Sequence, residues 1–231
     1  MNLIECKGLS KHFVGVQALD DINLTIEPGH IVGLLGPNGS GKTTLIKLLN
    51  GLLTPSNGTV TIAENKPSPE TKAVVAYLPE RIALPQWMTT KQALDYYQDF
   101  FADFQRETAE SMIQNLGLTM NQRIKAMSKG TKEKLQLILT MSRKAKLYLL
   151  DEPIGGVDPA TRDYILRTII SNYNEDATII ISTHLIADVE KILDEVIFLQ
   201  NGHVVLHDSV DNIRNEKGTS VDALFREVFR C

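Results

Sequence analysis

The segment 36–44 has the residue types and the spacing of a phosphate-binding loop. It reads GPNGSGKTT, a glycine followed by four residues and then Gly-Lys-Thr. Its glycines let the backbone turn N–H groups toward an anion, and a helix that starts near Gly41 adds its positive end. Lys42 supplies a cation for the outer phosphates, and the Thr43 hydroxyl is placed to bind Mg²⁺. The predicted nucleoside triphosphate site contains Asn38, Gly39, Ser40, Gly41, Lys42, Thr43 and Thr44.

Two acidic residues follow a second apolar run. The run 147–150 reads LYLL and predicts a buried strand, and Asp151 and Glu152 come directly after it. An acid at the tip of a strand beside a phosphate loop holds Mg²⁺ through its water shell, which is the role predicted for Asp151. Glu152 projects in another direction and is predicted to polarise the attacking water as a general base. The alternative is a strand whose exposed end is capped by acids.

Two further residues join this group. His184 ends the apolar run ATIIISTH, and at a strand tip its imidazole is placed to contact the γ-phosphate. A lone histidine at a strand end is usually structural, so this prediction depends on the loop and the acids. Asp158 lies in the turn GGVDP and, with Pro159, predicts the start of a helix. The predicted catalytic residues are Lys42, Glu152 and His184.

Short runs of branched residues alternate with turns and helical stretches around these motifs. Continuous apolar strands that alternate with helices indicate a parallel sheet covered on both faces, with the phosphate loop at the carboxyl end of its strand. Asn201-Gly202 separates two apolar runs and predicts a hairpin. The predicted strands are 3–6, 22–26, 31–35, 59–62, 147–150, 177–181 and 196–199.

The character of the sequence changes between about residues 84 and 144. Branched runs disappear there, and long helical stretches replace them, with breaks at Gly117 and near Ser128. This pattern predicts a helical subdomain inserted into an α/β core, with residues 1–231 forming one domain. A last helix is predicted at Val221–Phe229.

The composition limits the partners and the compartment. The chain has 231 residues and a formal net charge of −4 at pH 7, which offers no general attraction to nucleic acid, so we expect no nucleic-acid partner. Cys6 and Cys231 have no ligand spacing around them and favour a reducing compartment. The apolar runs are too short to cross a bilayer and no signal peptide is evident. We therefore expect a cytoplasmic protein that is peripheral to a membrane only through a partner.

Five motifs, taken together and in order, resemble a known family. They are GPNGSGKTT, MSKGT, LYLLDEP, GGVDP and STH, and they are similar to those of the nucleotide-binding subunits of ATP-binding cassette (ABC) transporters. The resemblance spans 13–206, and MSKGT, at 127–131, is its most specific part because other phosphate-loop ATPases lack it. It implies an α/β phosphate-loop NTPase core with a mostly parallel sheet, an N-terminal antiparallel β part and a helical subdomain.

The resemblance also implies partners and further site residues. In this family two cassettes form a head-to-tail dimer that holds ATP between one phosphate loop and the partner's signature segment, which is MSKGT here. Ser128 and Gly130 would then contact the γ-phosphate across the interface, where Asp158 helps to couple the two sites. Phe13 falls where the family stacks an aromatic ring on adenine, with Val16 beside it. A core position is the alternative for Phe13.

Three residues depart from the family pattern, and one of them is Thr131, which replaces the usual glutamine of the signature segment. Glu80 follows the YLP-like strand where the family has a glutamine that senses Mg²⁺, and Lys129 replaces a glycine of the signature segment. A carboxylate about 4 Å from another negative charge costs about 4 kcal/mol at an effective dielectric constant of about 20. Glu80 should therefore not face the γ-phosphate directly: it should meet the water shell of the metal, or turn away until the site closes. We hypothesise that Lys129 offsets Glu80 near the partner's triphosphate; the alternative is that the two changed independently and Lys129 lies in solvent.

The motifs favour a transport ATPase subunit that uses ATP and Mg²⁺. ATP binding closes a dimer of this chain with itself or with a homologous cassette, and a separate transmembrane permease converts closure into transport. The apolar segment 83–88 is expected to line a groove for a permease helix, unless Trp87 packs into the core. The departures at Glu80 and Lys129 are similar to those of small export-type cassettes. The second candidate function is a soluble cassette ATPase outside transport, for example in cofactor assembly.

Overall fold

The computed structural model describes residues 2–172, 174 and 176–229. Cys231 lies outside the described residues. In chain order the elements are β1 (Ile4–Phe13), β2 (Val16–Ile26), β3 (Ile31–Leu35), α1 (Lys42–Leu49), β4 (Asn57–Ile62), α2 (Pro69–Ala73), β5 (Val75–Leu78), α3 (Thr90–Phe100), α4 (Arg106–Asn115), η1 (Ile124–Ala126), α5 (Lys129–Met141), β6 (Leu147–Asp151), α6 (Pro159–Ser171), β7 (Thr178–Thr183), α7 (Ile186–Val189), η2 (Glu190–Ile192), β8 (Glu195–Gln200), β9 (His203–Ser209), α8 (Val210–Lys217) and α9 (Val221–Phe229).

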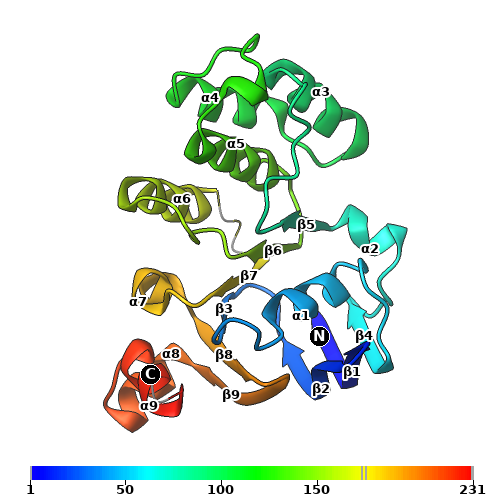
Figure 1. Cartoon of the computed structure of the whole chain (residues 1–231), viewed down its shortest axis with the longest axis vertical. Coiled ribbons are helices and arrows are strands. Elements are labelled where there is room, and N and C mark those ends of the chain that lie inside the picture. The colour runs from blue at the N-terminus through cyan, green and yellow to red at the C-terminus, as the bar shows by residue number, and fades with distance from the viewer. Residues whose placement is uncertain (1, 173, 175, 230–231) are drawn as a thin grey trace.

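A six-stranded sheet runs through the middle of the molecule (Figure 1). Its order is β5-β6-β7-β3-β8-β9, and every neighbouring pair is parallel except β8 and β9. A second sheet, β2-β1-β4, is antiparallel. The predicted fold class is therefore confirmed. Because β3, β6 and β7 are adjacent and parallel, the residues that follow them meet at one edge of the sheet.

The two faces of the large sheet pack against different layers. On β3, Ile31 and Leu35 join a core shared with α6, α7, α8 and α9, whereas Val32 and Leu34 join a core shared with α1 and the antiparallel sheet. This alternation follows from the two-residue repeat of a strand. A strand buried on both faces must be apolar along its whole length, as the run IVGLL is.

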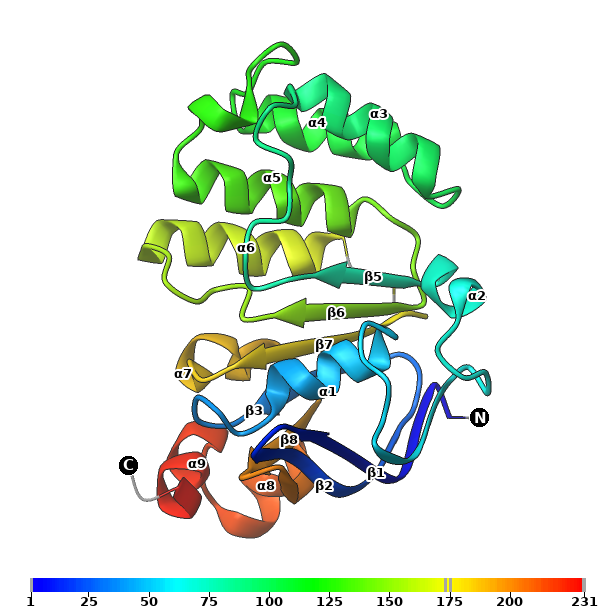
Figure 2. The same ribbon diagram turned by 45° about the vertical axis from the view of Figure 1, so that its right-hand side comes forward.

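The helices α3, α4 and α5 form a separate layer above the sheet (Figure 2). They enclose their own core, which includes Leu94, Ile113 and Leu135. The predicted breaks are found, because Gly117 follows α4 with a φ of +68° and Ser128 is the N-cap of α5. Within the described residues, no helix combines the length and the apolar character needed to span a membrane.

Several predicted boundaries were wrong. The first strand is longer than 3–6, because β1 pairs with both β2 and β4 and these ladders hold its polar second half extended. The predicted strand 22–26 is only the second half of β2. A further break between α3 and α4 was missed. There, Gln105 donates its backbone N–H to the carbonyl of Ser142, and Arg143 binds the carboxylate of Asp103 at 2.9 Å, so tertiary contacts set this break.

Candidate active site

The loop after β3 requires glycine at two positions. A Cβ atom on Gly36 would lie 2.3 Å from the carbonyl oxygen of Leu199. Gly41, the N-cap of α1, has a φ of 109°, and a Cβ there would lie 2.6 Å from the carbonyl oxygen of Ala18. The left-handed conformation and the close backbone neighbours both exclude a side chain. The chain can therefore turn from β3 into α1 within a few residues, as predicted.

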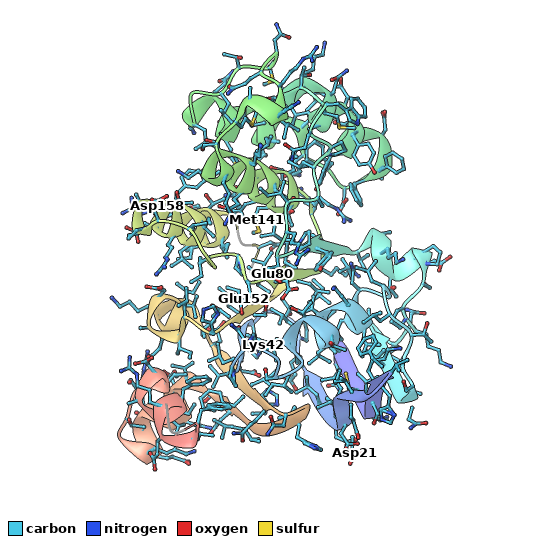
Figure 3. The ribbon with its side chains drawn as sticks, in the orientation of Figure 1. Asp21, Lys42, Glu80, Met141, Glu152 and Asp158 are labelled. Carbon is cyan, nitrogen blue, oxygen red and sulfur yellow. The ribbon has the colours of Figure 1, made fainter. Side chains whose placement is uncertain are left out.

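The side chain of Lys42 is buried at the centre of this loop, with 6% of its surface exposed. Its ammonium donates to the carbonyl oxygens of Gly36 at 2.8 Å and Pro37 at 3.1 Å. It also lies 3.4 Å from Oε1 of Glu152. One cation therefore connects the loop to the acids that follow β6, and Figure 3 shows Lys42 and Glu152 pointing toward each other.

Asp151 lies at the end of β6 and is almost fully buried. Its Oδ1 accepts hydrogen bonds from the hydroxyl of Thr43 at 3.0 Å and from the hydroxyl of Ser182 at 2.7 Å. Its Oδ2 is buried and has no hydrogen-bond partner among the described residues. Burial raises the pKa of Asp151, the two hydroxyls oppose that effect, and the charges of Glu80 and Glu152 add to it.

This arrangement fits a divalent cation. The unpartnered oxygen of a buried carboxylate is costly unless it meets a donor or a cation. The Thr43 hydroxyl gives its proton to Asp151, so its oxygen lone pairs remain available to a metal. Oxygen ligands of this kind suit Mg²⁺. Thr43 and Asp151 are therefore the residues that would hold it.

Glu152 shares no side-chain partner with Asp151 among the described residues and has two charged or polar partners of its own. Its Oε1 faces Lys42, and its Oε2 lies 3.1 Å from Nδ1 of His184. Its backbone has a φ of +47°, unusual for a residue with a side chain. The backbone N–H donates to both the carbonyl oxygen and the hydroxyl of Ser182, at 3.1 and 3.0 Å. The structure thus brings together all three predicted catalytic residues.

An open cavity of about 370 Å³ lies beside the loop. Its lining includes Glu80 and Val16 together with six of the predicted loop residues, which are Asn38, Gly39, Gly41, Lys42, Thr43 and Thr44. Ser40, the remaining loop residue, is buried, and its hydroxyl has no hydrogen-bond partner within the described part of the chain. Glu80 is exposed and lies near Asp151, whose pKa its charge raises.

Phe13 and Val16 flank the turn between β1 and β2. Phe13 is 46% exposed and Val16 is 60% exposed, so the alternative of a core position for Phe13 was wrong. The ammonium of Lys11 lies 5.2 Å from the centre of the Phe13 ring. The core alternative for Trp87 was also wrong, because that side chain is 67% exposed.

The signature segment 127–131 differs from the loop region in its bonding. The Ser128 hydroxyl caps its own helix by accepting from the backbone N–H of Thr131 at 3.2 Å. Asp158 caps α6 in the same way, accepting from the backbone N–H of Thr161 at 3.0 Å. It also accepts from the Thr161 hydroxyl at 2.7 Å, and this hydroxyl, followed by the backbone N–H, lowers the pKa of Asp158. Both capping residues are exposed. The structure does not bring Ser128 or Asp158 into contact with the phosphate loop of the same chain.

Lys129 belongs to the signature segment, and its side chain reaches toward the loop that follows β6. Its ammonium lies 3.5 Å from the carbonyl oxygen of Gly156 and 3.6 Å from Oε1 of Glu133, while the side chain is 68% exposed. Lys129 and Glu80 line one cavity of about 440 Å³, together with Glu152 and His184. The compensation hypothesis for Lys129 and Glu80 remains a prediction.

Sequence reasoning missed Ser182. It is fully buried on β7, bonds to Asp151 and holds the backbone of Glu152. The available signal was a polar residue inside an otherwise apolar strand, two positions before His184. Because side chains alternate along a strand, Ser182 and His184 belong to one face.

The fold and this site define a class of protein. A model of the ABC transporter family matches residues 19–155. The chain belongs to the ABC transporter family, as an ATP-binding and ATP-hydrolysing subunit. Family membership decides in favour of the transport ATPase subunit over the soluble cassette outside transport.

Individual relatives agree with this family. The ABC transporter ATP-binding protein YtrB of Bacillus subtilis (strain 168) is 32% identical over 217 residues, which is 93% of this chain and 74% of YtrB. A solved ATP-binding subunit of an ABC transporter has a TM-score of 0.87 at 29% identity, covering 98% of this chain and 99% of that chain. The dimeric cassette MJ0796 bound to ADP and Pi has a TM-score of 0.78 at 20% identity, covering 89% of this chain and 98% of its own, and shows a likeness of fold.

Proposed function

We propose that this chain hydrolyses ATP with Mg²⁺ at a site completed by a second cassette, and thereby drives a separate permease. The observation that carries the proposal is that two carboxylates adjacent in the sequence have different bonding partners. Asp151 is held by two hydroxyl donors, whereas Glu152 lies between an ammonium and an imidazole. Two acids in different surroundings suit different roles, one for a cation and one for a proton.

Each residue of the site has its own role in the proposed hydrolysis of ATP. The loop N–H groups and Lys42 bind the β- and γ-phosphates. Glu152 accepts a proton from water as the water oxygen bonds to the γ-phosphorus and the bond to the ADP oxygen breaks. His184 donates a hydrogen bond to the γ-phosphate and, through Nδ1, orients Glu152. Mg²⁺, held by Thr43 and Asp151 with Glu80 at its water shell, would neutralise charge on the phosphates.

The second half of the site comes from a partner cassette in this proposal. Ser128, Gly130 and Asp158 lie at helix starts, and within the described residues the hydrogen bonds of the exposed Ser128 and Asp158 side chains are local. MJ0796, which shares the fold, is dimeric with ADP and Pi bound. A head-to-tail pair would bring one chain's Ser128 and Gly130 to the triphosphate on the other chain. Phe13 and Val16 are proposed to contact adenine, because both are exposed and Val16 lines the loop cavity.

The remaining proposals concern architecture and partners. We regard residues 1–231 as one ATPase domain that contains a helical subdomain at about 84–144. The exposed Trp87 in the apolar segment 83–88 supports a permease contact there. The chain then works on the cytoplasmic face of a membrane through that permease, as an export-type cassette.

Two experiments test this function. Purified chain should release phosphate from ATP only with Mg²⁺, and the rate per chain should rise with protein concentration because the active form is a dimer. Affinity capture of the tagged chain from solubilised membranes should recover a polytopic membrane protein. A rate that is independent of both Mg²⁺ and concentration, or recovery of soluble partners alone, would contradict the proposal.

A further inference from the structure

The strand β7 carries one buried polar residue on the face that meets the phosphate loop. Ser182 lies opposite Asp151 in the parallel ladder of β6 and β7. Two positions earlier, Ile180 packs in the core that contains α1. The alternation of the strand therefore directs Ser182 toward the loop side, in a position where an apolar residue would pack. Burying a hydroxyl there is unfavourable unless it is fully hydrogen-bonded.

The hydrogen bonds of Ser182 fix the direction of its only proton. A backbone N–H can only donate, so the Ser182 oxygen accepts from the N–H of Glu152 at 3.0 Å. The Ser182 proton then goes to Oδ1 of Asp151, at 2.7 Å. One hydroxyl thus receives a hydrogen bond from the general base residue and gives one to the metal-binding acid.

The consequence for Asp151 is a defined orientation. The hydroxyls of Ser182 and Thr43 both donate to Oδ1, which leaves Oδ2 as the unpartnered oxygen. With one donor removed, the carboxylate can rotate and exchange its two oxygens. For Glu152, the Ser182 hydroxyl supports a backbone with a φ of +47°, beside the carbonyl oxygen of Ser182 at 3.1 Å.

We propose that Ser182 is a positioning residue that aims Asp151 at the divalent cation and holds the backbone of Glu152. The inference rests on the proposed function, because Ser182 acts through the roles proposed there for Asp151 and Glu152 and carries out no chemistry itself. It predicts that loss of the hydroxyl weakens metal binding. The affinity for ATP in the absence of metal should change very little.

The test is Mn²⁺ binding to the ATP-loaded chain, followed by electron paramagnetic resonance, for wild type, Ser182→Ala and Ser182→Cys. Ser182→Cys nearly keeps the volume but donates weakly, so it guards against a simple packing loss. Ser182→Ala should raise the Mn²⁺ midpoint about tenfold, as expected for one hydrogen bond to a charged group, and Ser182→Cys should be intermediate. Binding of a fluorescent ATP analogue in EDTA should match wild type for both variants.

Thr178→Val is the matched control. Thr178 is also fully buried on β7, and its hydroxyl accepts from Gly29 N–H at 3.0 Å and donates to the Glu27 carbonyl at 3.3 Å, at the other end of the strand. The substitution Thr178→Val should leave the Mn²⁺ midpoint unchanged. Wild-type midpoints in both Ser182 variants, or an equal shift in Thr178→Val, would overturn the inference. Wild-type chain that binds Mn²⁺ no better with ATP than without it would overturn the proposed function itself.

Discussion

The phosphate-loop region and the signature segment are organised in opposite ways. In the loop region, side chains bond to residues far away in the sequence, such as Thr43 to Asp151 across 108 positions and Ser182 to Asp151 across 31. At the signature segment and at α6, the side chains of Ser128 and Asp158 bond, among the described residues, to the residues three positions on. The first region is assembled by the fold of one chain, whereas the second presents capped helix starts to the outside.

This difference indicates which part of the site is complete within one chain and which part requires a partner. The loop region has its cations, acids and hydroxyls already in contact, so small changes there should act on chemistry within the chain. The signature segment makes few side-chain contacts within the described part of the chain, so changes there should act on association between chains. Four substitutions probe this contrast, from the largest expected effect to the smallest.

Glu152→Gln should lower ATP turnover about 1,000-fold, because the amide cannot accept the proton from water. ATP should still bind, and a dimer should accumulate. Phosphate release at steady state measures the first effect and size-exclusion chromatography the second. Glu195→Gln is the control, because Glu195 lies at the opposite edge of the sheet, bonded to His207 at 2.8 Å. Turnover near the wild-type rate in Glu152→Gln would remove the general base from the proposal.

Arg143→Met tests how the helical layer, whose helix α5 begins at the signature segment, is held to the sheet. Arg143 is 5% exposed and donates to the carbonyls of Val75 and Ala73, at 2.6 and 2.8 Å, and to Asp103. Breaking this buried pair should lower the free energy of unfolding by about 3 kcal/mol, measured in urea. The control Arg106→Met removes a partly exposed pair with Asp95 and should cost less than about 1 kcal/mol. Equal losses would show that Arg143 does not hold the helical layer to the sheet.

Gly130→Ala separates association from folding. A Cβ there would meet only Thr161 Oγ1, at 3.6 Å, so the folded chain accommodates it. Alanine in a helix should raise the free energy of unfolding by about 0.5 kcal/mol. Turnover should nevertheless fall about tenfold, because the methyl group projects where the partner's triphosphate must approach. The exposed Ser111→Ala on α4 is the control for a small helix substitution. If the Gly130→Ala chain is stabilised and its turnover is normal, the proposed contact between the signature segment and the partner's ATP is contradicted.

Lys129→Gly should have the smallest effect on the fold. Its own side chain is 68% exposed, although its partner Glu133 is only 18% exposed, and a pair with one solvent-exposed member contributes about 1 kcal/mol or less. If Lys129 serves the partner's triphosphate, ATP-driven dimerisation should weaken and depend less on salt. Analytical ultracentrifugation at two salt concentrations measures this, with Lys134→Met on the same helix as the control. Unchanged dimerisation and salt dependence would leave Lys129 without a role at the site.

The sequence predicted the elements that local chemistry specifies. The strand–loop–helix from Ile31 to Leu49, the hairpin at Asn201-Gly202 and the helix cap at Asp158 are all found, because each depends on residues close together in the chain. That Lys42, Glu152 and His184 lie together was also predictable, since parallel neighbouring strands end at one edge. Features that depend on distant partners were missed, such as the break held by Arg143 and the hydroxyl of Ser182, whose role appears only when β7 lies beside β6.

The central claim is that each site is shared by two cassettes, and the pair that can be tested directly is two copies of this chain. It is tested by mixing two inactive variants, Lys42→Ala with a defective loop and Gly130→Asp with a defective signature segment. Each alone should have little ATPase activity. Random pairing makes about half of the dimers mixed, each with one site built from two intact halves, so an equal mixture should recover about a quarter of wild-type activity. A mixture no more active than its components would contradict the shared site.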